Sequence, residues 1–263
     1  IAKESEIVFF IGGLNKNSSQ DSEGSDRQQY NLPYNQDNLI DSIAKVNKNI
    51  AVILISGNAI RMPWLSNVKT VMQSWYLGSE AGNAIASIIS GEVNPSGKLP
   101  FTFPKKLMDN GAHYYGELSY PGNGETQFYK EDILVGYRWH DTKKIKPNFA
   151  FGHGLSYTSF DLSKINSDKK SYSITDSIKI SCVVKNTGTV KGSEVIQIYI
   201  GKKNSKVKRA LKELKGFKKT SVNQGKSKKI EIKIGVNKLA FYDEKKSEWN
   251  IEKGEYIIYV GNA

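Results

Sequence analysis

The sequence predicts two domains of different classes, a parallel α/β domain followed by an antiparallel β sandwich. In the first part, short runs of apolar residues alternate with helical patterns, as in an open sheet whose strands are covered on both faces. Beyond residue 158, apolar and polar side chains alternate strictly, which is typical of antiparallel strands with one solvated face. The excess of basic charge begins at the same point. We therefore expect domains at residues 1–158 and 159–263.

The first domain begins with a strand, a helix and a second strand. Residues 7–11 are all apolar, and Gly12-Gly13 ends the run. Apolar side chains then recur at helical spacing from Gln36 to Val46. Residues 51–55 form a second continuous apolar run, which predicts another buried strand.

A third strand and a second helix extend this pattern. An apolar stretch from Val68 to Trp75 predicts the strand, and residues 81–89 predict an amphipathic helix that Gly91 stops. The order predicts a doubly wound, mostly parallel sheet. Three strands are few for such a sheet, and residues 1–6 resemble the last turns of a helix. We therefore expect the sheet to be incomplete at its N-terminus.

The second domain is predicted to be an immunoglobulin-like or fibronectin-like β sandwich. About seven alternating segments, separated by turn signals, occupy its roughly 105 residues. In one of them, Cys182 lies on the inward register, so the only cysteine is expected in the core and cannot form an intramolecular disulfide.

The second domain also carries the whole net charge of +12. It has 23 basic and 11 acidic side chains, whereas residues 1–158 have 15 of each. One interpretation is a soluble surface whose lysines guard the strand edges against pairing. The other is docking on an acidic polysaccharide or membrane surface. Nucleic acid is not expected, because arginines are few and no aromatic side chains lie between the lysines.

Composition argues against several other classes of protein. No apolar run approaches the roughly 20 residues that cross a bilayer. The three histidines are far apart and have no neighbouring cysteine or paired acidic residues, so neither a metal site nor a cofactor is expected.

The candidate site is the loop Asp21-Ser22-Glu23-Gly24-Ser25-Asp26-Arg27. It follows the carboxyl end of the first strand, where open α/β sheets bind their ligands. Glu23 is the candidate reactive carboxylate, the alternative being a solvated loop residue. Asp21 and Ser22 are expected to line the cleft and bind substrate. Asp26 and Arg27 are expected to scaffold the loop, with contacts to sugar hydroxyls as the alternative.

Four aromatic residues are candidate platforms for a sugar ring. A large aromatic near a strand end is either such a platform or part of the core, and among the four we assign substrate contact to Trp64. The four residues are Trp64, Trp75, Tyr76 and Trp139.

Several motifs in a fixed order resemble the C-terminal part of glycoside hydrolase family 3 enzymes, which include β-glucosidases and β-xylosidases. The resemblance covers nearly the whole chain, and the order of the motifs makes it specific where a lone motif would be weak. The motifs are Glu23-Gly24-Ser25-Asp26-Arg27, Gly78-Ser79-Glu80-Ala81-Gly82, the stretch from Gly91 to Pro104, Val135-Gly136-Tyr137-Arg138, the stretch from Phe151 to Thr158, residues 184–188 and residues 213–217.

The resemblance implies a retaining exo-acting β-glycosidase, most simply a β-glucosidase. In that family an N-terminal (β/α)8 barrel carries the nucleophilic aspartate, usually in a Ser-Asp-Trp setting, which does not occur in this sequence. The general acid/base lies in a Glu-Gly-x-Asp-Arg segment, which corresponds to Glu23. This chain alone is therefore expected to be nearly inactive. The resemblance also implies a periplasmic or secreted enzyme.

The partners that this resemblance implies are a β-linked oligosaccharide or glycoside and the missing barrel domain. A second copy of the chain, in a homodimer, is a further possible partner. The alternative function is a non-catalytic carbohydrate-binding or scaffolding protein with two domains. It predicts that changing Glu23 affects nothing beyond weak sugar binding.

Overall fold

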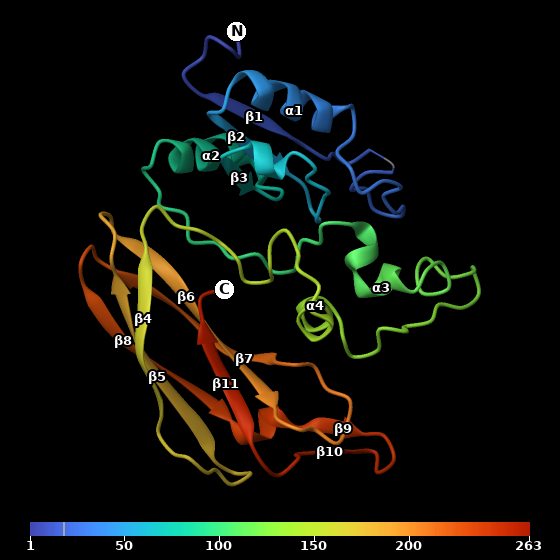
Figure 1. The fold of residues 1–263 in the computed structure, drawn as a ribbon, viewed down its shortest axis with the longest axis vertical. Coiled ribbons are helices and arrows are strands. Elements are labelled where there is room, and N and C mark those ends of the chain that lie inside the picture. The colour runs from blue at the N-terminus through green and yellow to red at the C-terminus, as the bar shows by residue number, and fades with distance from the viewer. Residues whose placement is uncertain (18) are drawn as a thin grey trace. The chain divides into compact units, whose positions relative to one another are not determined.

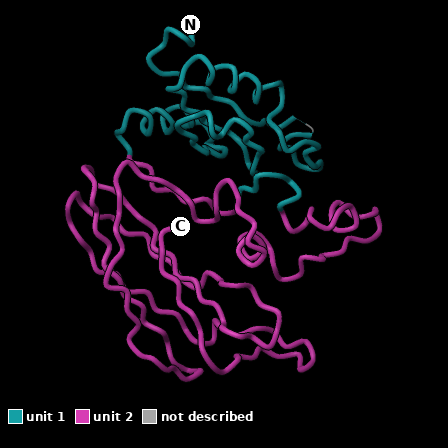
Figure 2. The backbone as a smooth tube through the Cα atoms, viewed as in Figure 1, with its two compact units in different colours: residues 1–93, 103–109 teal, residues 94–102, 110–263 magenta. Residues whose placement is uncertain are grey.

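The structure, a computed structural model, describes residues 1–17 and 19–263. The chain divides into two compact units (Figure 2). The first unit contains residues 1–93 and 103–109, and the second contains residues 94–102 and 110–263.

The first unit contains a parallel sheet of three strands in the order β1-β2-β3 (Figure 1). Phe10 of the first strand is in register with Val52 of the second, which is in register with Val71 of the third. This confirms the predicted parallel α/β class. The elements are β1 (Val8–Gly13), α1 (Gln36–Val46), β2 (Ile50–Ile55), η1 (Leu65–Asn67), β3 (Thr70–Gln73), η2 (Gly78–Glu80), α2 (Ala81–Ile89) and η3 (Leu107–Asp109).

Burial of β1 differs from the expectation that both of its faces are covered. The central strand β2 has Val52 and Leu54 fully buried. In β1, by contrast, Phe9 is 42% exposed and Ile11 is 56% exposed. Strand β1 pairs with β2 alone among the described strands, and one of its faces is uncovered in this chain. A continuous apolar run was therefore not sufficient to predict burial on both sides.

The end of β1 is fixed by close backbone contacts. Gly13 has φ +142°, and a Cβ placed there would lie 2.0 Å from the carbonyl oxygen of Ile55, so a side chain does not fit. The Gln36 side chain, at the start of α1, accepts a hydrogen bond from the Gly13 amide (2.8 Å) and donates one to the Gly13 carbonyl (2.9 Å). Hydrogen bonds to both the amide and the carbonyl of Gly13 thus fix the point where the chain leaves the sheet toward the candidate loop.

The second unit contains a β sandwich, which confirms the second predicted class. One sheet has the order β11-β6-β7, the other has the order β4-β5-β8, and β9 and β10 form a separate hairpin. The elements are α3 (Gly111–Tyr114), α4 (Tyr137–Lys143), β4 (Phe160–Ser167), β5 (Ser177–Asn186), β6 (Gly192–Lys202), β7 (Glu213–Val222), β8 (Ser227–Gly235), η4 (Val236–Leu239), β9 (Phe241–Asp243), β10 (Glu248–Asn250) and β11 (Tyr256–Gly261).

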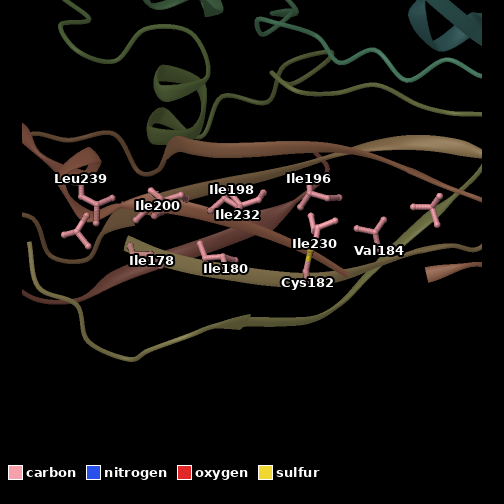
Figure 3. Packing of buried hydrophobic residues seen from close by; sticks show 13 residues of the cluster. Ile178, Ile180, Cys182, Val184, Ile196, Ile198, Ile200, Ile230, Ile232 and Leu239 are labelled. Carbon is pink, nitrogen blue, oxygen red and sulfur yellow. The ribbon is translucent and has the colours of Figure 1, made fainter. Parts of the chain in front are cut away.

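Alternate residues of the strands form the core of the sandwich (Figure 3). On β5, Ile178 and Ile180 are buried, while the residues between them face outward. Cys182 is buried on the same register and is a free thiol, as predicted. Burial raises the pKa of this thiol.

The segment before the sandwich is tied to strand β6. Lys98 forms an ion pair of 2.7 Å with Glu194, and both side chains are almost completely buried. The Lys98 ammonium also donates to the carbonyl oxygen of Gly154 at 2.6 Å. Residues 94–102 therefore belong to the compact unit of the sandwich. We propose that the sequence domains still divide between residues 158 and 159, because strand β4 begins at Phe160.

None of the helices in the described part of the chain has the length and apolar character needed to cross a membrane.

Candidate functional site

The candidate loop lies at the carboxyl edge of the parallel sheet of the first unit. It leaves β1 at Gly13, and the other strands end at the same edge because all three are parallel. Glu23 occupies an exposed turn of this loop. The next residue, Gly24, has φ +80°, a conformation that favours glycine and so explains the Glu-Gly pair. Within residues 1–17 and 19–263, the Glu23 carboxylate has no hydrogen-bond or ion-pair partner.

Asp21 connects the loop to the two neighbouring strand ends. Its Oδ2 atom accepts a hydrogen bond from the backbone amide of Gly57, just after β2, at 2.7 Å. The same oxygen accepts a second hydrogen bond from the hydroxyl of Tyr76, just after β3, at 2.8 Å. Burial, and then the hydrogen bond to Asp21, raise the pKa of Tyr76 to about 12. The Tyr76 hydroxyl therefore remains a donor at neutral pH.

A second set of side chains holds the segment that leads from β1 into the candidate loop. The Tyr34 hydroxyl accepts a hydrogen bond from the Gln20 side-chain amide at 2.9 Å. Gln20 in turn accepts one from the Asn15 backbone amide at 3.1 Å. Side-chain hydrogen bonds of Asn15, Asn17 and Gln20 to the Tyr34 hydroxyl lower the pKa of Tyr34. Within the candidate loop itself, the hydroxyl oxygens of Ser22 and Ser25 lie 2.8 Å apart.

Arg27 extends from the end of the loop into the interior of the first unit. Its Nη2 atom donates to the carbonyl oxygen of Ala59 at 2.5 Å, and its guanidinium lies 5.8 Å from the ring centroid of Tyr30. Burial lowers the pKa of Arg27, although the nearby charge of Asp21 acts in the opposite direction. Its Nη1 atom is buried without a hydrogen-bond partner among the described residues. These contacts suit the scaffold role that the sequence predicted.

The remaining candidates are placed differently. Asp26 is exposed beside Arg27, and its backbone carbonyl accepts a hydrogen bond from Gln28 at 3.3 Å. Trp64 is fully buried, and its indole N–H donates to Asp37 at 2.7 Å. A buried ring offers no face to a sugar, so the structure places Trp64 in the core, which was the alternative interpretation. Trp139 is also buried, in the second unit, whereas Tyr76 is 52% exposed.

The structure thus brings Asp21, Ser22, Glu23 and Arg27 together on one anchored loop. The Glu23 carboxyl group is exposed on this loop, whose backbone other residues hold in place. Such a group can donate and accept a proton, which is the chemistry of a general acid/base. In the described part of the chain, no three His, Cys, Asp or Glu side chains are grouped so as to hold a metal ion.

The sequence did not reveal the residues that hold the loop. Tyr76 had been considered only as a sugar platform, and Gln36 and Tyr34 had no predicted role. Their hydrogen bonds join positions that are between 14 and 55 residues apart in the sequence. The available signal in the sequence is the position of the Trp75-Tyr76 pair at the end of a predicted strand.

Comparisons with protein families agree with this architecture. The Glycosyl hydrolase family 3 C-terminal domain matches residues 1–157, and the Fibronectin type III-like domain matches residues 194–263.

Similar proteins are known by sequence. A beta-glucosidase from Bacteroides ovatus is 49% identical over 98% of this chain and 35% of its own length. Thermostable beta-glucosidase B from Acetivibrio thermocellus is 41% identical over 100% of this chain and 34% of its own length. The chain therefore spans about a third of the length of these relatives.

A solved structure is also closely similar. DesR, a beta-glucosidase from Streptomyces venezuelae in complex with D-glucose, has a TM-score of 0.92 at 35% identity, covering 100% of this chain and 33% of that one. The family matches, together with this structural similarity, lead to one conclusion: the chain belongs to glycoside hydrolase family 3, with the family's C-terminal α/β domain followed by a fibronectin type III-like domain.

Proposed function

We propose that Glu23 is the general acid/base of a retaining exo-acting β-glycosidase, most simply a β-glucosidase. The observation that supports this most directly is the state of its carboxyl group. Glu23 is exposed and unpaired in the described chain, while the residues around it anchor the loop. A proton donor must reach the glycosidic oxygen within hydrogen-bonding distance, and an anchored loop keeps it there.

The proposed reaction has two steps. In the first, a carboxylate nucleophile attacks the anomeric carbon while Glu23 gives its proton to the departing glycosidic oxygen. In the second, the Glu23 carboxylate takes a proton from water, whose oxygen displaces the nucleophile and releases the sugar. The two carboxyl groups of a retaining enzyme lie about 5.5 Å apart.

We propose that the nucleophile comes from a barrel domain outside this chain. Asp21 is the acid nearest to Glu23 in the sequence, but its Oδ2 atom is occupied by hydrogen bonds to Gly57 and Tyr76. These bonds suit an anchor better than a nucleophile. The 263-residue chain is then expected to be inactive by itself, and Ser22, on the same loop, is the proposed contact for a substrate hydroxyl.

The test measures hydrolysis of aryl β-glucosides by the complete product of the gene and by this chain alone. In the complete product, Glu23→Ala should lower kcat about 10²–10⁴-fold on substrates with poor leaving groups. A dinitrophenyl leaving group needs little protonation, so its first step should survive. Azide, which needs no general base, should then restore turnover and yield a β-glycosyl azide.

Glu6→Ala is the matched control, because Glu6 is another exposed glutamate of the first unit whose carboxylate has no hydrogen-bond or ion-pair partner among residues 1–17 and 19–263. It should leave kcat unchanged. Full activity of Glu23→Ala, or loss without azide rescue, would refute the acid/base role. A gene product without hydrolase activity would favour the alternative, a non-catalytic carbohydrate-binding or scaffolding protein.

We further propose that the enzyme acts in the periplasm or outside the cell, as the family resemblance implies. Fractionation of the source cells, with antibodies against this chain, tests this location.

A further inference from the structure

The outward face of strands β5 and β8 carries lysines at alternate positions. The two strands are antiparallel neighbours, and Ile178, Ile180 and Cys182 of β5 point into the core (Figure 3). The residues between them therefore face solvent. On the two strands these outward lysines, here called the lysine face, are Lys179, Lys185, Lys229 and Lys233, all of them exposed.

Two of these lysines are directly opposite each other. Lys179 and Lys233 are register partners across the β5–β8 pair. Like charges in this position destabilise a sheet. Acids also lie near these lysines: Glu231 is opposite Ser181, and Asp161 of β4 is opposite Lys185. The Asp168 carboxylate accepts a hydrogen bond from the Lys179 backbone amide at 3.0 Å. No side chain of the lysine face forms an ion pair within the described residues.

Three lysines elsewhere in the second unit have an acid within 4.0 Å. Lys203 pairs with Glu255 at 2.8 Å, and Lys208 pairs with Asp132 at 2.8 Å. Lys246 lies 4.0 Å from Glu248. These three lysines thus have an acid beside the ammonium group, whereas the ammonium groups of the lysine face form no ion pair within the described residues.

Further lysines extend the lysine face at the edge of the sheet. Lys226 and Lys228 lie at the start of β8, next to the end of β5, where the Asn186 amide donates to the Lys226 carbonyl at 3.0 Å. The Lys218 ammonium reaches the carbonyl oxygen of Glu231 at 3.3 Å, which brings it to the edge of β8. These three lysines are also without an ion pair in the described chain.

We propose that the lysine face binds an acidic polysaccharide, a polymer that carries carboxylates and hydroxyls along its chain. A carboxylate placed between Lys179 and Lys233 would remove their repulsion. The hydroxyls of Ser177, Ser181 and Ser227 lie on the same outward register and suit the neutral hydroxyls of a sugar. This binding is distinct from the proposed hydrolysis and does not depend on it.

The composition of the face favours a polysaccharide over other polyanions. Strands β5 and β8 have no arginine and no aromatic residue, the groups that pair with phosphates and stack on bases. Val183 is their one apolar residue on the outward register, which is too little to insert into a lipid bilayer.

The test measures binding of the 263-residue chain to polygalacturonate by isothermal titration calorimetry at low salt. A neutral β-glucan serves as the control polymer. The triple variant Lys179→Gln, Lys229→Gln, Lys233→Gln should bind about tenfold more weakly or worse, because each lysine contributes charge at the surface. Added sodium chloride should weaken binding of the unmodified chain by screening.

A matched triple variant separates local charge from net charge. It consists of Lys203→Gln, Lys208→Gln and Lys246→Gln, and it removes the same three charges from the same unit. The affinity of this variant for polygalacturonate should stay within about twofold of that of the unmodified chain. Its fold should not be affected, since exposed ion pairs contribute little free energy. Circular dichroism confirms that both variants are folded.

Three results would overturn the proposal. The first is an equal loss in both triple variants, which would indicate only net charge. The second is no binding to polygalacturonate, or binding that salt does not weaken. The third is tighter binding to double-stranded DNA or to phosphatidylglycerol vesicles through the same three lysines.

Discussion

The hydrogen bond between Asp21 and Tyr76 makes a measurable prediction about the candidate loop. Burial is the first cause of the raised Tyr76 pKa, and the hydrogen bond and charge of Asp21 come next. Replacing Asp21 by asparagine keeps a hydrogen-bond acceptor but removes the charge. The pKa of Tyr76 should then fall from about 12 toward its usual value near 10, without reaching it, because the burial remains.

The same contact determines how stability depends on pH. A raised pKa means that the folded state holds the Tyr76 proton more tightly than the unfolded state. The resulting stabilisation is complete below pH 10 and is lost as the pH rises from 10 through about 12. In Asp21→Asn, this loss should still begin near pH 10, but it should be smaller and should be complete at a lower pH than in the unmodified chain.

The cost of removing the anchor follows from its two hydrogen bonds. Both bonds, to Gly57 and to Tyr76, lie at the surface, so water replaces part of what Asp21→Ala removes. We expect a loss of about 1–2 kcal/mol in the free energy of unfolding. A double-mutant cycle with Tyr76→Phe should give a coupling of about 0.5–1 kcal/mol.

The assay is a spectrophotometric tyrosine titration combined with urea unfolding. Tyr76→Phe identifies the Tyr76 signal among the 14 tyrosines. Glu23→Gln is the matched control, since it removes a charge from the same loop and Glu23 is not among the groups that shift the pKa of Tyr76. An unchanged Tyr76 pKa in Asp21→Asn, or zero coupling in the cycle, would refute the anchor.

Two further predictions concern stability. Lys98→Met should cost about 3–5 kcal/mol in urea unfolding, because it leaves the Glu194 carboxylate buried without its charge partner, and adding Glu194→Gln should recover much of this loss. A double variant as unstable as Lys98→Met alone would contradict that explanation. Gly13→Ala should destabilise the first unit by more than about 1 kcal/mol, since the alanine Cβ would lie 2.0 Å from the carbonyl oxygen of Ile55 in β2. A melting temperature equal to that of the unmodified chain would rule out this close contact.

The regular elements could largely be predicted from local patterns. Helix α1 spans Gln36–Val46, as the apolar spacing indicated, and α2 spans Ala81–Ile89. Burial was harder to predict. Of the apolar residues that defined α1, Ile40 is fully buried, but Leu39 is 51% exposed. Periodicity reports which residues share a face, whereas burial depends on what covers that face.

The segment from Asp109 to Phe128, where the sequence shows no helical period, contains the short helix α3. Its N-cap, Asn110, accepts a hydrogen bond from the Ala112 amide at 3.1 Å. The tyrosines and glycines of the segment concealed this helical turn, because it has too few residues to show a period.

The sequence by itself determined the two domain classes, the family resemblance and the place of Glu23 on a loop after the first strand. Each of these depends on residues that are close together in the chain, or on motifs in a fixed order. Only the tertiary structure decided that Asp21 contacts Tyr76, that Trp64 is buried, and that Lys179 and Lys233 are opposite each other on the lysine face. These features depend on strand register and on contacts between distant residues, and no local pattern specifies which distant side chains meet.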